Sequence, residues 1–277
     1  MAVNSTIAKL VSTKILRTIE NNLVAKQICN QEPDAPIKKA GDTVYFSSLN
    51  DPTISAYTGN VSYEDIQDGS VALLIDQQNS YAFKVDDIEA FQSSIDIKGS
   101  QVQRAGYGLR NVADQYVLAL HAGAGQTITA TVTPTNVLST TSKMSRLLKE
   151  NNVMDGWIVV PPWYEELLEL AGVKFKINEG LNGEKGGIKW AEYRNLNIMC
   201  SNNVPTTGSE GSKVSSIMAG SYNSIIYAEQ IMKSRFIDEL ESTFAGGASG
   251  LHVFGSRVLK PKELVTLTAT QGAISDI

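Results

Sequence analysis

The side chains most often used for catalysis and metal binding are few in this chain and lie far apart in the sequence. The 277 residues include two histidines, His121 and His252, and two cysteines, Cys29 and Cys200. A Ser-His-Asp or Cys-His site needs a histidine that a third group orients, and the sequence nominates no such group near either histidine. The cysteines match no metal-binding or redox spacing. We therefore interpret both histidines as packing residues and both cysteines as reduced thiols in a reducing compartment.

Two further groups of residues have a suggestive composition but the wrong spacing or setting for chemistry. The glycines around Lys185 in residues 180–187 do not form the G-x-x-x-x-G-K-[ST] pattern of a phosphate-binding loop, so a surface loop is the better interpretation. We expect Glu165, Glu166 and Glu169 to lie on the exposed side of a short helix, where a solvated face is commoner than an acid/base pair. The sequence therefore predicts no enzyme, no cofactor and no metal site.

Composition is that of an ordinary folded protein with one large domain or two smaller ones. Hydrophobic residues make up 42% and charged residues 19% of the sequence, which suits a chain with a sizeable core. No apolar run approaches the roughly 18 residues of a membrane-spanning helix, and the N-terminus lacks the apolar core of a signal peptide. The net charge of −5 argues against a surface that binds nucleic acid over its whole extent. We expect neither a membrane partner nor secretion.

A long helical pattern over residues 86–122 is the element that should position the rest of the chain. Apolar or small residues recur in it at alternating spacings of three and four, which is the period of a helix. At 1.5 Å per residue the helix would be roughly 55 Å long. The acidic pair Asp86 and Asp87 suits its N-terminus, and Gly123 suits its end. Three glycines within residues 99–108 predict a bend or a break there.

Two segments before this helix have too few apolar residues to form cores of their own. Residues 1–40 form a partly helical arm with six basic and three acidic residues, for a local charge of +3. Residues 41–85 should form strands and carry six acidic residues against one lysine, for a local charge of −5. Within them the polar stretch 51–70 is long enough to be a projecting hairpin. We expect both segments to lie on other parts of the protein or on other subunits.

The remaining elements are predicted from apolar runs bounded by glycine, proline and asparagine. Strands are expected at 43–46, 54–57, 61–63, 71–75, 81–85, 127–133, 157–160, 196–200, 214–219, 225–228, 251–254 and 264–268. One helix should start near Pro134 and end at Asn151. Strand 157–160, two prolines, a helix over 162–171 and Gly172 form a βα unit that begins a new module.

The order of these parts is more informative than any single motif. A basic arm is followed by a G-D-T-V strand that opens an acidic hairpin, and then by V-D-D-I-E before a long helix that ends in A-D-Q-Y-V-L-A-L. A W-I-V-V-P-P module and C-terminal strands through V-F-G-S-R-V-L-K-P complete the chain. This order resembles the major capsid proteins of tailed double-stranded DNA bacteriophages, which share the Hong Kong ninety-seven capsid fold. The resemblance covers nearly the whole chain.

The resemblance implies an α+β fold in which a long spine helix organises a peripheral domain. Its parts would be an N-terminal arm (1–40), an extended loop (41–85), a peripheral domain (86–155), an axial domain (156–228) and C-terminal strands that return to the peripheral domain (229–277).

The same resemblance implies a structural protein whose copies assemble, as pentamers and hexamers, an icosahedral phage head around double-stranded DNA. Such a protein would be made in the cytoplasm of the bacterial host and would reside in the virion. Since the arm starts at Met1, we expect no added pro-segment and a separate scaffolding protein, together with a portal, a possible decoration protein and non-specific contact with packaged DNA. One alternative is an encapsulin-like shell protein of a bacterial nanocompartment. A soluble α+β enzyme is a further alternative, against which the missing histidine, metal and phosphate motifs argue.

The opposite charges of the arm and the hairpin indicate a contact between subunits. Such a contact would fix the register of neighbouring copies more than it would add affinity. The alternative is two solvated segments that do not touch, because exposed ion pairs contribute little. The candidate inter-subunit contacts are the basic residues of the arm and the acidic residues of the hairpin: Lys9, Lys14, Arg17, Lys26, Asp51, Glu64, Asp65 and Asp68.

Overall fold

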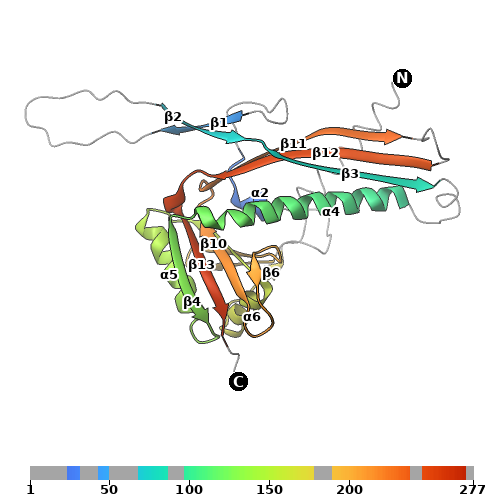
Figure 1. The fold of residues 1–277 in the computed structure, drawn as a ribbon. Coiled ribbons are helices and arrows are strands. Elements are labelled where there is room, and N and C mark those ends of the chain that lie inside the picture. The colour runs from blue at the N-terminus through green and yellow to red at the C-terminus, as the bar shows by residue number, and fades with distance from the viewer. Residues whose placement is uncertain are drawn as a thin grey trace, which may run out of the picture.

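The structure, a computed structural model, describes six stretches of the chain: residues 24–31, 43–49, 68–86, 97–177, 189–237 and 245–272. Two units make up most of these residues (Figure 1). One is a long three-stranded sheet that lies along a single long helix, and the other is a mixed sheet with two helices. The predicted α+β class is therefore confirmed.

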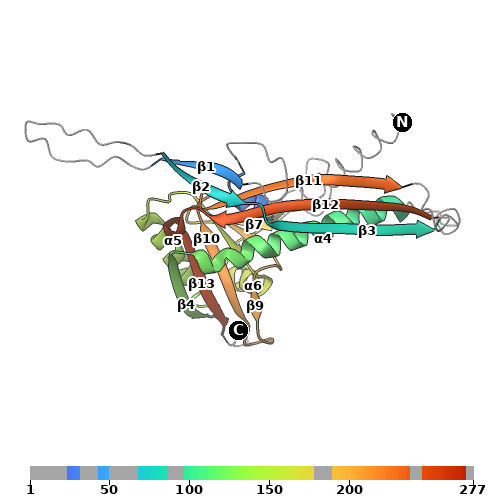
Figure 2. The same cartoon turned by 45° about the horizontal axis from the view of Figure 1, so that its top comes forward.

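Three long antiparallel strands form the first sheet, and Figure 2 shows them side by side along the helix. In order across the sheet they are β11 (Ile225–Ile237), β12 (Ala245–Val258) and β3 (Gln77–Asp86). The helix α4 (Ile97–Leu118) is continued by the 3₁₀ helix η1 (Ala119–Gly123). The ring of Tyr116 on α4 meets that of Phe254 on β12 edge to face, with 5.5 Å between centroids. Aromatic packing of this kind holds the helix against the sheet.

Two glycines in β12 let other parts of the chain pack closely against it: a tyrosine ring at Gly250 and a main-chain oxygen at Gly255. A Cβ atom at Gly250 would come within 2.4 Å of the Tyr81 ring on β3. A Cβ atom at Gly255 would come within 2.6 Å of the main-chain oxygen of Leu74. Both distances are far inside van der Waals contact, so only glycine fits at these two positions without a shift of its neighbours.

A short antiparallel pair, β1 (Thr43–Leu49) and β2 (Asp68–Leu74), forms the base of the predicted hairpin. Its inward side chains share a small buried cluster with the long sheet: Val44, Phe46, Leu73, Ile75, Ile226, Ala228 and Val253. Burial of this cluster attaches the hairpin base to β11 and β12. The strands predicted at 54–57 and 61–63 lie outside the described residues.

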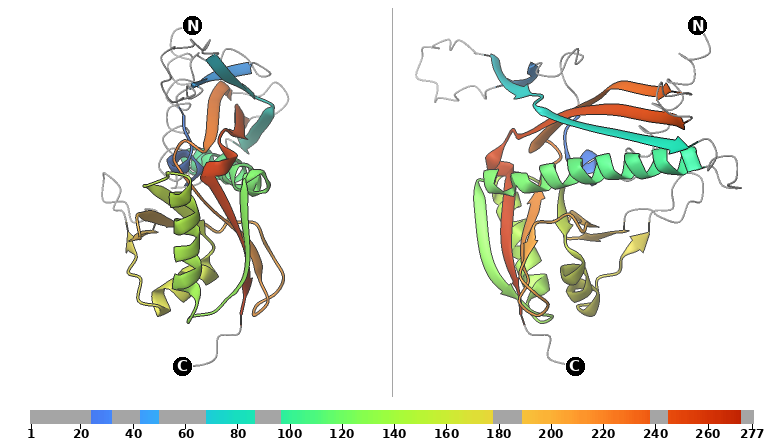
Figure 3. Two further views of the ribbon diagram at one scale, coloured as in Figure 1. Left: turned by 90° about the vertical axis from the view of Figure 1, so that its left-hand side faces the viewer. Right: turned by 45° about the vertical axis from the view of Figure 1, so that its right-hand side comes forward.

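The second sheet has seven strands in one path and an eighth that pairs with β10 only. In order they are β4 (Gln126–Val132), β13 (Leu264–Gln271), β10 (Val214–Gly220), β5 (Gly156–Val160), β8 (Leu196–Cys200), β7 (Lys189–Tyr193) and β6 (Lys176–Ile177), with β9 (Thr206–Thr207) beside β10. β4 pairs in parallel with β13 and β5 with β8, whereas the other pairs are antiparallel. The helices α5 (Val137–Glu150) and α6 (Pro162–Leu170) lie on one side of the sheet (Figure 3).

The predicted βα unit is confirmed and lies at the centre of this second core. All five residues of β5 are buried, as its continuous apolar sequence requires. Pro162 occupies the first turn of α6, and Gly172 follows that helix with a φ of +91°. The indole of Trp157, which has no exposed surface, donates a hydrogen bond to the main-chain oxygen of Ser221 over 3.0 Å. The unit therefore satisfies this buried side-chain donor as it packs.

The long helix is present but differs from the prediction in two ways. Asp86 is the last residue of β3, so its expected role at the helix N-terminus is wrong; Asp87 lies outside the described residues. The 22 residues of α4 continue without interruption through all three glycines, so the predicted break is also wrong (Figure 1). Packing along β3 and β12 outweighs the weak helix propensity of glycine. The helical segment ends at Gly123, as predicted.

Most other predicted strands and the helix before Asn151 are confirmed within the described residues. The main difference is length. β11 and β12 run for 13 and 14 residues, far beyond the predicted ranges 225–228 and 251–254. A register shift between Ile231 and Lys233 interrupts their pairing without ending it.

The expected domain boundaries do not coincide with the edges of these sheets. Residue 156 begins β5, which belongs to the same sheet as β4. The C-terminal strand β13 lies between β4 and β10 in that sheet rather than in the long sheet. Residue 229 lies inside β11. The mixed sheet thus combines strands from three of the five expected parts.

Candidate functional site

A buried polar cluster attaches the N-terminal helix α2 (Val24–Ile28) to the long sheet. The ammonium of Lys26 pairs with the carboxylate of Glu229 on β11. Glu229 also accepts a hydrogen bond of 2.6 Å from the Tyr227 hydroxyl and lies 3.3 Å from Nε2 of His252. The side chains of Lys26 and Glu229 are only 12% and 11% exposed, so the pair is largely removed from water. Four side chains from three elements therefore meet at one point.

The electrostatics of this cluster favour an ionised Glu229. Burial alone would raise the pKa of this carboxyl, but the hydrogen bond from His252 and the charge of Lys26 outweigh burial and hold the pKa below its usual value. Burial and the neighbouring carboxylate raise the pKa of Tyr227 well above 10, so its hydroxyl stays a donor. The cluster is therefore an ion pair whose carboxylate also accepts hydrogen bonds from Tyr227 and His252.

A second buried carboxylate fixes the other end of α2. Asp114, which lies on α4 and is 4% exposed, accepts a hydrogen bond of 3.0 Å from the main-chain N–H of Ala25. Asn203 donates to its other oxygen over 3.4 Å. Burial raises the pKa of Asp114 despite these donors, and burial followed by the nearby Asp114 charge raises the pKa of the Cys29 thiol. The carboxylate links the arm helix, the spine helix and the loop after β8.

Main-chain bonds extend this attachment to Asn30. Its N–H donates to the oxygen of Ile225 over 2.8 Å, and its own oxygen accepts from the N–H of Tyr227 over 2.9 Å. These bonds form an isolated parallel β-bridge between Asn30 of the arm and Ile226, the second residue of β11. Residues 24–30 are thereby fixed where the chain passes from β10 of the mixed sheet into the long sheet.

These contacts bear directly on the predicted inter-subunit residues. Lys26 has a partner in its own chain and little exposed surface, which leaves it little room for a contact with a neighbouring subunit. Asp68 is the first residue of β2 and pairs through its backbone with Leu49. The other six candidates lie outside the described residues: Lys9, Lys14, Arg17, Asp51, Glu64 and Asp65. The contact between arm and hairpin remains a prediction for them.

The histidines, cysteines and glutamates considered for chemistry lie in packing or surface positions, and one of them, Glu165, is not where it was predicted. His252 is fully buried and stacks on Phe254 at 5.2 Å, and the main-chain oxygen of His121 accepts a hydrogen bond from Thr266. Neither cysteine forms a disulfide within the described residues. The prediction that Glu165 is exposed is wrong: it is 8% exposed, because the buried face of α6 is wide enough to include it. Glu166 is exposed, as is Glu169.

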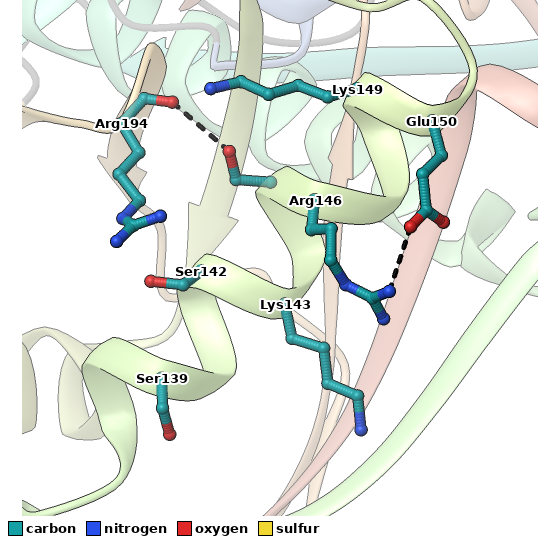
Figure 4. A pocket seen from close by; sticks show the side chains of 8 residues that line it. Ser139, Ser142, Lys143, Arg146, Lys149, Glu150 and Arg194 are labelled. Atoms are coloured by element: carbon teal, nitrogen blue, oxygen red, sulfur yellow. Dashed lines mark hydrogen bonds and ion pairs between the residues drawn. The ribbon is translucent and has the colours of Figure 1, made fainter.

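A basic hollow of about 810 Å³ lies between α5 and the turn that joins β7 to β8 (Figure 4). It is lined by four cationic side chains, one carboxylate and three serines: Lys143, Arg146, Lys149, Arg194, Glu150, Ser139, Ser142 and Ser145. Arg146 pairs with Glu150 over 2.9 Å. Within the described part of the chain, the other three cations have no carboxylate partner. The hollow therefore carries a surplus of positive charge in a chain whose net charge is −5.

The backbone brings the fourth cation of this hollow into place. Arg194 and Asn195 form the two-residue turn between β7 and β8, with φ angles of 49° and 65°. The Ser145 hydroxyl donates to the main-chain oxygen of Arg194 over 3.3 Å, which holds the turn against α5. Sequence reasoning missed this site. The spacing of Lys143 and the two cations after it on a predicted helix was a usable signal, but nothing local indicated Arg194.

The sequence matches no family model and no curated protein. Solved structures do match, although at low identity. A structure of Mycobacterium phage Che8 is 20% identical over 89% of this chain and 91% of its own, with a TM-score of 0.65. The capsid structure of cyanophage P-SCSP1u is 14% identical over 92% and 89%, also with a TM-score of 0.65. The chain has the Hong Kong ninety-seven capsid fold.

Other structures with this fold are similar along nearly their whole length. The virus-like particle from Pyrococcus furiosus is 10% identical over 94% of this chain and 99% of its own, with a TM-score of 0.57. In the terms of this fold α4 is the spine helix. None of the helices in the described stretches is long and apolar enough to cross a bilayer. The same stretches hold no cluster of three or more His, Cys, Asp or Glu side chains suited to a metal ion.

Proposed function

We propose that this chain is a major capsid protein, whose copies form the pentamers and hexamers of an icosahedral phage head around double-stranded DNA. The observation that carries the proposal is the extent of the similarity: the fold match covers about nine-tenths of both this chain and the cyanophage capsid chain. A match of that extent involves the whole subunit rather than one module. The role is structural rather than enzymatic, and the mature location is the virion.

Physical features of the subunit support an assembling protein. The hairpin base is attached by a cluster of only a few buried side chains. The short helix α2 has no core of its own: Val24, Ala25 and Ile28 are buried in the main core, and the polar cluster fixes the helix there. Segments fixed in this way at one end are suited to complete their packing on neighbouring copies. Heterologous contacts that close by rotation produce rings, which are what pentamers and hexamers are. Stable interfaces of this kind bury roughly 2,000 Å² or more.

The division into parts follows from the strand pairing, as a proposal that amends the sequence-based ranges. The peripheral part would combine α4 with β3, β11 and β12, and the axial part would be the mixed sheet with α5 and α6. β4 and β13 then belong to the axial part because they pair within the mixed sheet. The arm and the extended loop keep their predicted ranges, 1–40 and 41–85.

The proposed function also implies partners and a place of synthesis. A separate scaffolding protein, a portal and a possible decoration protein would complete the head, and the subunit would be made in the host cytoplasm. The remaining basic residues of the arm would contact the acidic hairpin of a neighbour. Raising the ionic strength should then slow assembly, and assembly rates that do not respond to salt would contradict this contact.

Expression of the chain alone, followed by negative-stain microscopy and sedimentation, tests the function. Closed shells or discrete pentamers and hexamers are the expected result. A monomer that stays monomeric when the products of neighbouring genes are added would overturn the proposal.

A nanocompartment shell is the second candidate, and the similarity to the virus-like particle from Pyrococcus furiosus favours it. The two candidates differ in what the particle encloses. Particles purified from their natural source should contain nuclease-protected DNA if the chain is a phage capsid protein. A protein cargo and no protected DNA would favour the nanocompartment.

A further inference from the structure

We propose that the basic hollow on α5 binds the phosphate groups of a nucleic acid backbone. Lys143, Arg146 and Lys149 lie on successive turns of α5 and line the hollow together with Arg194. In Figure 4 the side chain of Lys149 extends toward Arg194, and those of Lys143 and Arg146 extend away from it. With Glu150 as the one carboxylate among the lining residues, the hollow carries a net charge of +3. The inference names where DNA enclosed by the proposed capsid would touch the subunit, so its biological setting rests on that function.

The hollow is assembled at a cost to the stability of the fold. Like charges three residues apart on a helix repel each other. Arg194 occupies the first position of a two-residue hairpin turn at a φ of 49°, where Asn, Asp and Gly are preferred. Arginine at this backbone angle is strained. The turn nevertheless places this fourth cation beside the three cations of α5. An anion in the hollow would relieve the repulsion, and the contacts within the described residues do so only for Arg146.

The chemistry of the lining favours a backbone over base edges. The Ser139 hydroxyl donates to the main-chain oxygen of Asn136 over 2.8 Å, and the Ser142 hydroxyl donates to that of Leu138 over 2.7 Å. Their protons are therefore committed to α5, and recognition falls to the cationic side chains. Lysine and arginine contacts of this kind read phosphate charge and not sequence.

A row of cations fits a regular polyanion better than the acidic groups of a second copy. The three cations of α5 are spaced about 4.5 Å apart along the helix axis, within reach of consecutive phosphates through their long side chains. A nucleic acid backbone carries one charge per nucleotide. This sequence, in contrast, contains no run of three acidic residues. A hollow of about 810 Å³ also has room for more than one phosphate group.

The salt dependence of DNA binding tests the assignment. The full chain is titrated against a fluorescent random-sequence DNA duplex over a series of salt concentrations, and log K is plotted against log[salt]. The double variant Lys143→Gln/Lys149→Gln, which leaves the Arg146–Glu150 pair intact, should reduce the slope by about 1.8, because each lost phosphate contact contributes about 0.9. The control Lys174→Gln/Lys262→Gln removes two exposed lysines outside the hollow and should leave the slope unchanged.

Two single variants separate binding from folding. Arg194→Asn places a preferred residue in the turn, so it should raise the melting temperature while it reduces the slope by about 0.9. A purely structural role for Arg194 predicts the first change without the second. Glu150→Gln frees Arg146 and should strengthen DNA binding.

Three outcomes would overturn the inference. The first is that the natural chain shows no measurable DNA binding. The second is that the hollow and control double variants give equal slopes. The third is that the hollow variant loses binding to poly-glutamate, or loses self-association, while its DNA binding is unchanged. The last outcome would assign the hollow to carboxylates of another copy. Shell formation is scored by microscopy on the same samples. If shells stay absent even when the products of neighbouring genes are added, and the slope difference persists, the proposed function is refuted and this inference stands.

Discussion

Replacing Glu229 by glutamine should destabilise the folded subunit by about 3 kcal/mol. The change removes the charge that compensates the Lys26 ammonium, and both side chains are close to nine-tenths buried. Loss of one partner of a buried ion pair costs roughly 3–5 kcal/mol because the other charge is left uncompensated. The lower end applies because each side chain keeps some contact with water. Glutamine preserves the volume of the side chain, so a cavity contributes little.

A double-mutant cycle isolates the interaction. Lys26→Met should cost only about 1–2 kcal/mol, because Glu229 keeps its contacts with Tyr227 and His252. The double variant leaves no unpaired ammonium, so it should be more stable than the sum of the single effects by about 2 kcal/mol. The assay is urea unfolding of the unassembled subunit at neutral pH with linear extrapolation.

The control uses an exposed pair in the same chain. Glu150→Gln removes the carboxylate of the Arg146 pair, whose side chains are 60% and 52% exposed, and should change the unfolding free energy by less than about 0.5 kcal/mol. If Glu229→Gln costs no more than this control, or if the two single effects of the cycle simply add, the reasoning about the buried pair is refuted.

Three other predictions concern pH and glycine. Because folding lowers the pKa of Glu229, the ionised carboxylate contributes to stability above the ordinary pKa of 4.5, and this contribution is lost as the pH falls through the pKa of the folded state. The difference in unfolding free energy between the natural chain and Glu229→Gln, measured by urea unfolding, should therefore shrink below pH 4.5. Gly250→Ala should lower the unfolding free energy by about 1–3 kcal/mol, since its Cβ would meet the Tyr81 ring at 2.4 Å. Gly108→Ala should raise the unfolding free energy by about 1 kcal/mol, because a Cβ there meets nothing within 4 Å on α4. Unchanged midpoints in either glycine variant would contradict the packing argument.

Local signals in the sequence predicted those elements that depend on short stretches of chain. Strand β5 is a continuous apolar run that Pro161 ends, and α6 starts at Pro162 and is closed by Gly172, so every boundary has a cause within a few residues. β4 also has an alternating pattern, in which Ile128 and Val132 are buried and the threonines between them are exposed. Such elements are predictable because the competing conformations are excluded locally.

Elements that depend on distant partners were missed or misjudged. β12 begins with Ala245, followed by two glycines, a composition that disfavours a strand. It is extended there because β3 pairs with it from Ala245 and β11 pairs with it from Gly247. Asp86 extends β3 through the same pairing. The Lys26–Glu229 pair joins residues from opposite ends of the sequence, so no local pattern could reveal it.

Within the described stretches, charged residues differ in burial, and burial limits the contacts that each of them can make. A buried charge must be compensated within the subunit, and Lys26 and Glu229 compensate each other where the arm joins the long sheet. An exposed charge carries no such requirement, so uncompensated cations such as Lys143 and Lys149 can persist only at the surface. Neither the sign of a charge nor its position in the sequence distinguishes buried from exposed residues. The sequence predicted Lys26 as an inter-subunit contact because it lies in the basic arm, and it predicted no contact for the cations of α5. Burial therefore assigns Lys26 and Glu229 to the stability of the subunit and leaves Lys143 and Lys149 accessible from the surface.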